Sequence, residues 1–344
     1  MKYIGNKTRL LEFIDKSMQE SGVPIGGVFM DIFGGTGSVG KYFKNKGYQI
    51  ISNDMMLYSY IAQYVNVYMN TIPKFSKISA SGIEGVLEIL NDPNLKKTGY
   101  VYDNFAPGGT YKRQYFSDFN AMRIDAVRDQ IEDWYLNGKL SVDEYYVLVY
   151  MLIDAADFVA NISGTYGAYL KIWRSMALKP LCLKIPAVID NKCDNYIYQQ
   201  DANCLIEQVK GDVLYLDPPY NQRQYAPNFH VLETLAVWDK QVLAGKTGQR
   251  DYSDKKSDYC QKIKATKALK DLVSKAKFKY IILSYNNEGI ISREDILDIL
   301  SSVGKVEEYV EDYRRFRTER NNANRHYKEC DDKVQEHLYV VKIS

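Results

Sequence analysis

The chain lacks the sequence features of a disulfide-stabilised, zinc-binding or membrane-spanning protein. Its 344 residues include only five cysteines, which are odd in number and form no Cys-x-x-Cys pair, so neither a disulfide framework nor a zinc site is expected. The longest apolar stretch, YYVLVYMLI (145–153), is too short to cross a bilayer. The first ten residues, MKYIGNKTRL, lack the apolar core of a signal peptide. We therefore expect a cytoplasmic globular protein with no metal and no membrane partner.

A strong excess of charge of one sign is also missing. Lysine and arginine number 45 and aspartate and glutamate 43, so the formal net charge is only +2 and does not by itself indicate nucleic acid. The basic residues are nevertheless clustered, with lysines at 255–279 and arginines interleaved with aromatics at 313–328. Arginine pairs bidentately with phosphate, so the arginine cluster is a candidate backbone contact. The lysine cluster is equally typical of a solvated helix face.

Strand-like runs alternate with helical patterns near both ends of the chain. GVFMDIF (27–33) and YQIISND (48–54) are apolar runs joined by a glycine turn and a helical stretch, which predicts a βαβ unit and a parallel sheet. Five further strand patterns follow at 196–201, 212–217, 280–287, 305–312 and 337–343. The last two are expected to form an antiparallel pair at the end of the sheet.

The alternation stops between about residues 71 and 190. One stretch places Ile124, Val127 and Ile131 on a single helical face, with Ser117 as its expected cap. A second stretch opens with Ser141 and Glu144, which predicts a capping box. Glycine-rich loops accompany both, so this region is expected to be a mostly helical insertion.

A glycine cluster follows the first expected strand. In DIFGGTGSVG (31–40), Phe33, Gly35 and Gly37 form Phe-x-Gly-x-Gly and not the dinucleotide pattern Gly-x-Gly-x-x-Gly. A tight glycine turn lets the backbone approach a ligand closely, and the helix that follows supplies N–H donors.

Two acids end other strands. Asp54 could accept both ribose hydroxyls of a nucleoside, although a helix cap is the alternative. Asp201 could accept a hydrogen bond from an adenine amino group, or could serve as a turn or cap residue.

The tetrapeptide DPPY (217–220) follows directly on the apolar run DVLYL. Ligands bind at this edge of an open α/β sheet. An exocyclic amine of a nucleobase is a poor nucleophile because its lone pair is delocalised into the ring, so methylating it requires acceptors for its hydrogens. The Asp217 carboxylate and the Pro218 carbonyl offer two acceptors, and the Tyr220 ring offers a stacking face worth about 1–3 kcal/mol. The motif predicts electrostatic positioning without a covalent intermediate.

DPPY together with DIFGGTG resembles the S-adenosylmethionine-dependent amino-methyltransferases, and the aspartate before Pro-Pro indicates adenine N6 rather than cytosine N4. KYIGNK (2–7) is similar to the N-terminal cofactor motif of the D12-class, Dam-like DNA adenine methyltransferases, and the motif order matches their α arrangement. The resemblance covers essentially the whole chain. It implies an α/β Rossmann-like methyltransferase sheet, with catalytic parts at 1–70 and 191–344 and a target-recognition domain inserted at 71–190.

The resemblance also implies roles for individual residues. Binding of S-adenosyl-L-methionine is expected at Tyr3, Lys7, Phe33, Gly35, Thr36, Gly37, Asp54 and Asp201. The target adenine would be held by Asp217, Pro218, Pro219 and Tyr220. Independently of the resemblance, charge and aromatic character make eight residues candidate DNA contacts: Lys112, Arg113, Tyr166, Lys171, Arg223, Arg314, Arg315 and Arg317. After Tyr220 the chain departs from the commonest Dam form and is similar to a restriction-associated branch, which leaves the target sequence open.

These features predict a site-specific enzyme that methylates N6 of a flipped-out adenine in double-stranded DNA, functionally paired with a restriction endonuclease or of phage type. Methylation of RNA or of another amine is a second interpretation, and a catalytically idle DNA-binding relative is a third. The intact Asp217, Tyr220 and glycine turn favour an active enzyme. His230, beside Phe229 in an apolar helix, is expected to pack or hydrogen-bond. No cysteine lies in the Pro-Cys motif of C5-cytosine chemistry.

Overall fold

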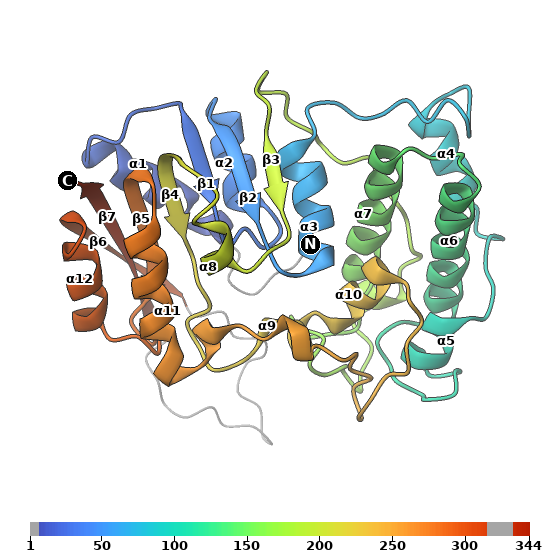
Figure 1. The fold of residues 1–344 in the computed structure, drawn as a ribbon. Helices are drawn as coiled ribbons and strands as arrows, with labels where there is room; N and C mark the ends of the chain where they lie inside the picture. The colour runs from blue at the N-terminus through green and yellow to red at the C-terminus, as the bar shows by residue number, and fades with distance from the viewer. Residues whose placement is uncertain (1–6, 315–332) are drawn as a thin grey trace. The chain divides into compact units, whose positions relative to one another are not determined.

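The computed structural model describes residues 7–314 and 333–344, which divide into two compact units (Figure 1). Among these residues, unit 1 consists of Met56–Asp190 and Ala226–Ser253, and unit 2 consists of 7–55, Asn191–Tyr225, 254–314 and 333–344. The expected insertion, 71–190, lies wholly in unit 1. Unit 1 also takes in residues 56–70 and 226–253, which flank the expected catalytic motifs in the sequence.

Unit 2 is built on a seven-stranded sheet in the order β3-β2-β1-β4-β5-β7-β6. Its strands are Val28–Asp31 (β1), Gln49–Asn53 (β2), Tyr196–Tyr198 (β3), Gly211–Leu216 (β4), Phe278–Asn286 (β5), Gly304–Arg314 (β6) and Lys333–Ile343 (β7). The first five pair in parallel, whereas β7 lies antiparallel between β5 and β6. The Rossmann-like α/β sheet and its terminal antiparallel pair are therefore confirmed.

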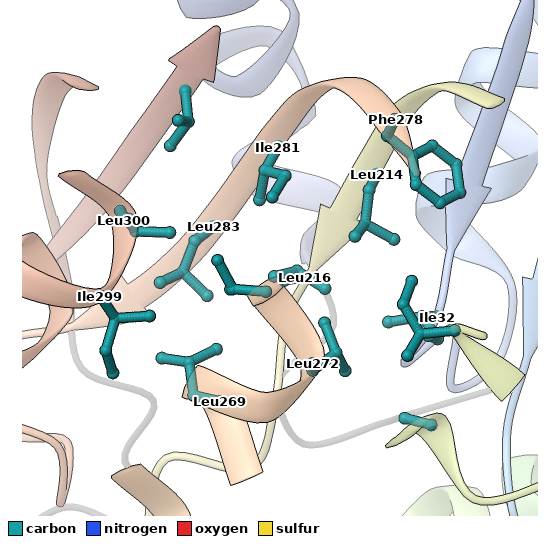
Figure 2. Close-up of a cluster of buried hydrophobic side chains, with 14 of the residues drawn as sticks. Ile32, Leu214, Leu216, Leu269, Leu272, Phe278, Ile281, Leu283, Ile299 and Leu300 are labelled. Carbon is teal, nitrogen blue, oxygen red and sulfur yellow. The ribbon is translucent and has the colours of Figure 1, made fainter. Parts of the chain in front are cut away.

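Helices of unit 2 cover both faces of this sheet. They are Leu11–Glu20 (α1), Ser38–Asn45 (α2), Ala202–Leu205 (α8), Lys262–Lys275 (α11) and Arg293–Ser301 (α12), with short 3-10 turns at Lys7–Arg9, Ser253–Lys255 and Asp258–Cys260. Figure 2 shows Leu269 and Leu272 of α11 meeting Leu214, Leu216 and Leu283 of the central strands, and all five side chains are fully buried. Each such burial contributes about 1.5–3 kcal/mol. This cluster fixes the strands whose carboxyl ends carry the candidate site.

Unit 1 is helical apart from its loops and two isolated bridges, within the residues described. Its helices are Leu57–Gln63 (α3), a π-helical turn Tyr64–Tyr68, Ile83–Leu90 (α4), Tyr100–Phe105 (α5), Asp118–Leu136 (α6), Val142–Phe158 (α7), a 3-10 turn Ser175–Leu178 and His230–Val237 (α10), and Tyr225–Asn228 (α9) precedes α10. Both predicted caps are confirmed. The Ser117 hydroxyl accepts a hydrogen bond from the Asn120 N–H, and Ser141 and Glu144 form a capping box.

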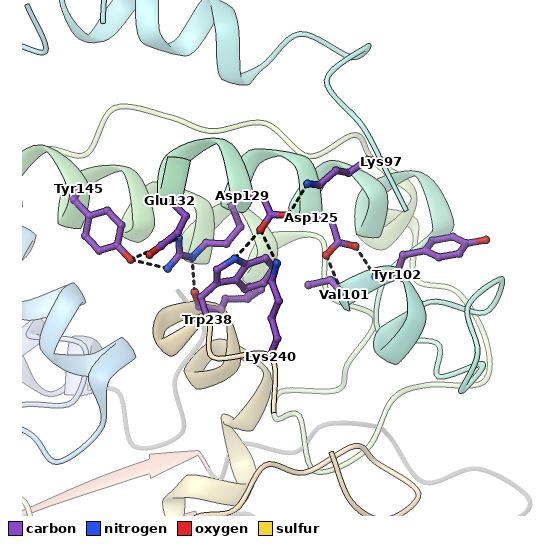
Figure 3. A network of polar contacts seen from close by, with 11 residues as sticks. Lys97, Val101, Tyr102, Asp125, Asp129, Glu132, Tyr145, Trp238 and Lys240 are labelled. Carbon is purple, nitrogen blue, oxygen red and sulfur yellow. Dashed lines mark hydrogen bonds and ion pairs between the residues drawn. The ribbon is translucent and has the colours of Figure 1, made fainter. Parts of the chain in front are cut away.

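A buried arginine joins three helices of unit 1 (Figure 3). Arg128 of α6 is fully buried and donates to the Leu235 carbonyl of α10 at 2.9 Å, to Glu132 at 2.6 Å and to the Tyr145 hydroxyl of α7 at 2.7 Å. The neighbouring Asp129 accepts from Trp238 Nε1 at 2.8 Å. Each nitrogen of the Arg128 guanidinium thereby donates to one acceptor, and two of these acceptors belong to other helices.

We expect Arg128→Met to lower the free energy of unfolding of unit 1 by about 2–3 kcal/mol, because the buried Leu235 carbonyl and Glu132 lose their donor. Lys97→Met is the matched control, since the Lys97–Asp129 ion pair is half-exposed and worth about 1 kcal/mol or less. All three tryptophans, Trp134, Trp173 and Trp238, belong to unit 1, so tryptophan fluorescence during urea denaturation reports on it. Equal losses in the two variants would contradict the account.

Candidate active site at the carboxyl ends of β1, β2 and β4

Three carboxylates of unit 2 mark the ends of adjacent strands. Asp31 is the last residue of β1, Asp54 directly follows β2, and Asp217 directly follows β4, while β1 pairs with both of the other strands. Asp31 is 1% exposed, and its Oδ1 has no hydrogen-bond partner among the described residues. Burial raises the pKa of Asp31 well above its usual value, and the charges of Asp217 and Asp54 add to this. Acidic side chains therefore gather at this edge of the sheet, and Asp31 favours the neutral form.

The glycine turn between β1 and α2 meets one of these acids. Gly35 and Gly37 have φ values of +51° and +77°, in the left-handed region that side chains disfavour. The Gly35 N–H donates to Asp54 Oδ2 at 3.1 Å, and the Gly34 N–H donates to the Asn53 carbonyl at 2.8 Å. The turn and the end of β2 are therefore held together.

Three other residues expected near the cofactor belong to the same unit. Asp201 is exposed and caps α8, accepting from the N–H groups of Asn203 at 2.9 Å and Cys204 at 3.2 Å. This is the cap alternative, and contact with a cofactor adenine remains a proposal. The ring of Phe33 packs edge-on against Tyr259, with centroids 5.0 Å apart. Thr36 is buried in the turn.

The DPPY motif is anchored on both sides. It leaves the buried end of β4, and the Tyr220 carbonyl accepts a hydrogen bond from the Ile290 N–H at 3.0 Å in the loop that follows β5. Pro218 is buried, whereas Pro219 and Tyr220 are partly exposed. The Tyr220 ring also packs against the hydrophobic cluster beneath the sheet. The backbone of the motif is therefore fixed, while part of the tyrosine ring stays accessible.

The structure places Lys7 beside Asp217, and its expected contact with the cofactor stays a prediction. Lys7 Nζ lies 3.2 Å from Asp217 Oδ1 and 2.5 Å from Glu336 Oε1, and the Ser284 hydroxyl donates to the same Glu336 oxygen. The side chains of Lys7, Asp217 and Glu336 are 6%, 17% and 2% exposed. Sequence reasoning missed Ser284 and Glu336, since neither lies in a motif, and Glu336 is 329 positions from Lys7.

Burial and neighbouring charges shift the pKa values of Asp217 and Lys7. Burial raises the pKa of Asp217 to about 7, Glu336 adds to the rise, and Lys7 opposes it. Burial lowers the pKa of Lys7, but Asp217 and Glu336 together outweigh it and hold that pKa well above its usual value. Lys7 thus stays cationic, whereas Asp217 changes charge near neutral pH.

Two residues expected to contact DNA are buried within unit 1. Arg113 is 4% exposed and donates to the backbone carbonyls of Asn104, Gly245 and Lys246 at 3.0–3.1 Å. Tyr166 is fully buried, and its hydroxyl donates to Asp157 at 3.0 Å. These placements speak against base contacts and assign both side chains to the framework of the unit.

Three of the remaining expected DNA contacts are exposed, and the side chains of the other three are not described. Lys112, Lys171 and Arg223 are exposed. Arg314 ends β6, and its side chain is not described. Arg315 and Arg317, like Tyr3 near the cofactor motif, lie outside the described residues.

The prediction for His230 is confirmed. The side chain is 1% exposed, and Nε2 lies 3.0 Å from the Tyr166 carbonyl. Burial lowers the pKa of His230 to about 4. A neutral, packed histidine fits this environment.

Residues 7–314 and 333–344 contain neither a candidate membrane-spanning helix nor a candidate metal-binding group. No helix in these ranges is long and apolar enough to cross a membrane. No group of three or more His, Cys, Asp or Glu side chains there could hold a metal ion.

Comparison of the sequence with known proteins identifies the family of the chain. The sequence model of the D12 class N6 adenine-specific DNA methyltransferases matches residues 3–299. Type II methyltransferase M.FokI from Planomicrobium okeanokoites is 42% identical over 90% of this chain and 48% of its own length. Modification methylase StsI from Streptococcus sanguinis is 39% identical over 94% of this chain and 50% of its own.

A third relative is matched over almost its full length. Type II methyltransferase M.NlaIII from Neisseria lactamica is 39% identical over 99% of this chain and 99% of its own. The chain therefore spans about half the length of M.FokI and StsI and nearly all of M.NlaIII. With the family match covering most of the sequence, the chain belongs to the D12 class of N6 adenine-specific DNA methyltransferases.

Proposed function

We propose that this protein is a site-specific enzyme that transfers a methyl group from S-adenosyl-L-methionine to N6 of an adenine in duplex DNA. Family membership supplies the reaction class, a methyl donor and DNA as the substrate. The observation that carries the assignment of residues is the meeting of the glycine turn, Asp54 and Asp217 at the ends of three adjacent strands. The relatives' names as type II enzymes and modification methylases favour pairing with a restriction endonuclease.

The residues at this edge fit the proposed cofactor. Gly35 and Gly37 would let the backbone of the turn approach it closely, and Asp54, which lies beside the turn, would accept its ribose hydroxyls. When bound, S-adenosylmethionine supplies an electrophilic methyl group on a cationic sulfonium. Asp31 is buried at the same edge of the sheet, but its raised pKa favours the neutral acid, so no charge interaction with the cofactor is assigned to it.

DPPY would receive the target base. An adenine within a duplex cannot reach the cofactor, so the base must be flipped out at a cost of a few kcal/mol. The Tyr220 ring offsets part of this cost by stacking. Lys7 engages Asp217 Oδ1, so Asp217 Oδ2 and the Pro218 carbonyl are the proposed acceptors for the two amino hydrogens. These acceptors localise the nitrogen lone pair and aim it at the methyl carbon.

Loops of unit 1 form a candidate DNA surface, which we call the loop cluster (106–115, 162–174 and 239–252). Arg113 ties the first loop to the third through the Gly245 and Lys246 carbonyls, and Gln114 donates to the Lys171 carbonyl in the second at 3.2 Å. The side chains of Lys112, Lys171 and Lys246 are exposed on this scaffold. A rigid loop platform that carries exposed cations suits a phosphate backbone.

We expect Lys171→Ala and Lys246→Ala each to reduce the salt slope of DNA binding by roughly one, because each removes one phosphate contact. Lys139→Ala is the matched control. Lys139 is an exposed lysine beyond the far end of α6, about 28 Å from the loop cluster along that helix. Fluorescence anisotropy at several salt concentrations measures the slopes. Equal slopes in all three variants would remove the loop cluster from the interface.

Expression in a methylation-free host, followed by modification-sensitive single-molecule sequencing of host DNA, tests the proposed function. N6-methyladenine confined to one short sequence context is the expected result. Unmodified adenines in cells that contain folded, cofactor-binding protein would contradict it. Methylation of an RNA substrate in vitro at a rate equal to that of duplex DNA would shift the assignment to RNA.

A further inference from the structure

We propose that Glu336 is a positioning residue that shares the Lys7 ammonium with Asp217, and thereby fixes the orientation and charge of the carboxylate that receives the target amine. The proposal rests on the proposed function of Asp217. Glu336 lies on β7 and belongs to none of the sequence motifs, although it contacts Lys7 in the fold.

The geometry is that of one cation between two carboxylates. Lys7 Nζ is 2.5 Å from Glu336 Oε1 and 3.2 Å from Asp217 Oδ1, so its closer partner is Glu336. Ser284 on β5 donates its hydroxyl to Glu336 and secures that side chain from a second direction. β7 lies directly beside β5, and Glu336 pairs with Asn286 in their register. Glu336 is therefore held rigidly and in turn holds Lys7.

Sharing the ammonium changes what Asp217 can do. Without Glu336, the Lys7 ammonium would interact with Asp217 alone. That interaction would be strong, because a buried ion pair has little competition from water. Glu336 draws the ammonium toward itself and leaves Asp217 more strongly basic. Asp217 is then a better acceptor for the weakly acidic hydrogens of a nucleobase amine.

Other charged or titratable groups face this cluster. Asp31 on β1 and Tyr215 on β4 interact electrostatically with Asp217. On β6, Glu311 lies opposite Glu336 in register and is exposed. Lys7 is the cation whose ion pairs join Asp217 to Glu336. The effect of Glu336 and the effect of Lys7 on Asp217 can be measured separately, by replacing one of the two with a neutral residue.

The pH dependence follows from these contacts. Burial and Glu336 hold the pKa of Asp217 at about 7 against Lys7. The acceptor form is the carboxylate, so kcat/KM for DNA should fall as pH drops through about 7, by about tenfold per unit further down. Removing the negative charge of Glu336 should lower the pKa of Asp217 and move this acidic limb to lower pH. Removing Lys7 should move it to higher pH.

Profiles of kcat/KM against pH for Glu336→Gln, Glu336→Asp and Lys7→Met test the proposal. A downward shift of about one unit in Glu336→Gln would leave the variant about half of its plateau rate at pH 6, where the wild type keeps about a tenth. Glu336→Asp retains the charge and should restore a limb close to that of the wild type. Lys7→Met should shift the limb upward.

Two outcomes would overturn the proposal. One is a Glu336→Gln profile that has the wild-type shape after scaling, since a purely structural role lowers the rate equally at every pH. The other is an unmoved limb in Lys7→Met, which is decisive even if Glu336→Gln does not fold. Failure of the proposed function has a different signature, because the wild-type protein would then yield no N6-methyladenine at any pH.

Discussion

Asp217→Ala is expected to reduce methyl transfer by about 10²- to 10³-fold or more, while binding of cofactor and DNA persists. In the proposed mechanism the carboxylate acts on the amine as positive charge develops on its nitrogen, so its contribution would be made mainly in the transition state. The loss of Asp217 leaves Lys7 paired with Glu336, and no isolated buried cation results. Single-turnover transfer of a tritiated methyl group measures the rate, and calorimetry and anisotropy measure the two binding steps.

Asp212→Ala is the matched control for this variant. Asp212 lies near the opposite end of β4, where it accepts from the Val28 N–H and pairs with Lys279. It should therefore cost some stability but little activity. A rate for Asp217→Ala within tenfold of the wild type would remove Asp217 from the chemistry.

Gly35→Val is expected to abolish cofactor binding. Gly35 has a φ of +51° in a buried turn, and its N–H holds Asp54, so a branched side chain both strains the backbone and fills the approach to the ligand. Isothermal titration with S-adenosylmethionine should show no measurable heat of binding. The variant should lose methyltransferase activity because it no longer binds the cofactor.

Gly22→Val separates backbone strain from the loss of the site. Gly22 has a φ of +72°, and a Cβ added there would meet no atom within 4 Å. This variant carries a similar conformational penalty of about 1–2 kcal/mol but should bind the cofactor normally. Wild-type affinity in Gly35→Val would refute the assignment of the turn, and equal loss in both variants would attribute the effect to strain alone.

Local sequence patterns were sufficient to predict most of the sheet and the positions of Asp54 and Asp217 at the ends of its strands. Apolar runs bounded by glycine or acidic residues gave the five parallel strands, and the positions of Asp54 and Asp217 directly after two of them predicted a shared edge. The Ser117 and Ser141 caps were predictable because a helix cap is a local interaction.

Long-range contacts account for what could not be predicted. Arg113 lies in YKRQY, a composition typical of a DNA contact, yet it donates to carbonyls 132 and 133 positions away. Glu336 reaches Lys7 only because β7 inserts between β5 and β6, next to β5. A sequence pattern can show that a side chain is charged or aromatic, but burial against a distant segment decides whether that side chain binds a ligand or supports the fold.

Nucleoside analysis of the methylated product tests the central claim most directly. Purified protein is incubated with S-adenosylmethionine carrying a tritiated methyl group and with duplex DNA, and the DNA is then digested to nucleosides and separated. The account predicts that the label is found in N6-methyladenine and is absent when Asp217 is replaced by alanine. Label in N4-methylcytosine or C5-methylcytosine, or near-normal labelling of adenine by Asp217→Ala, would contradict it.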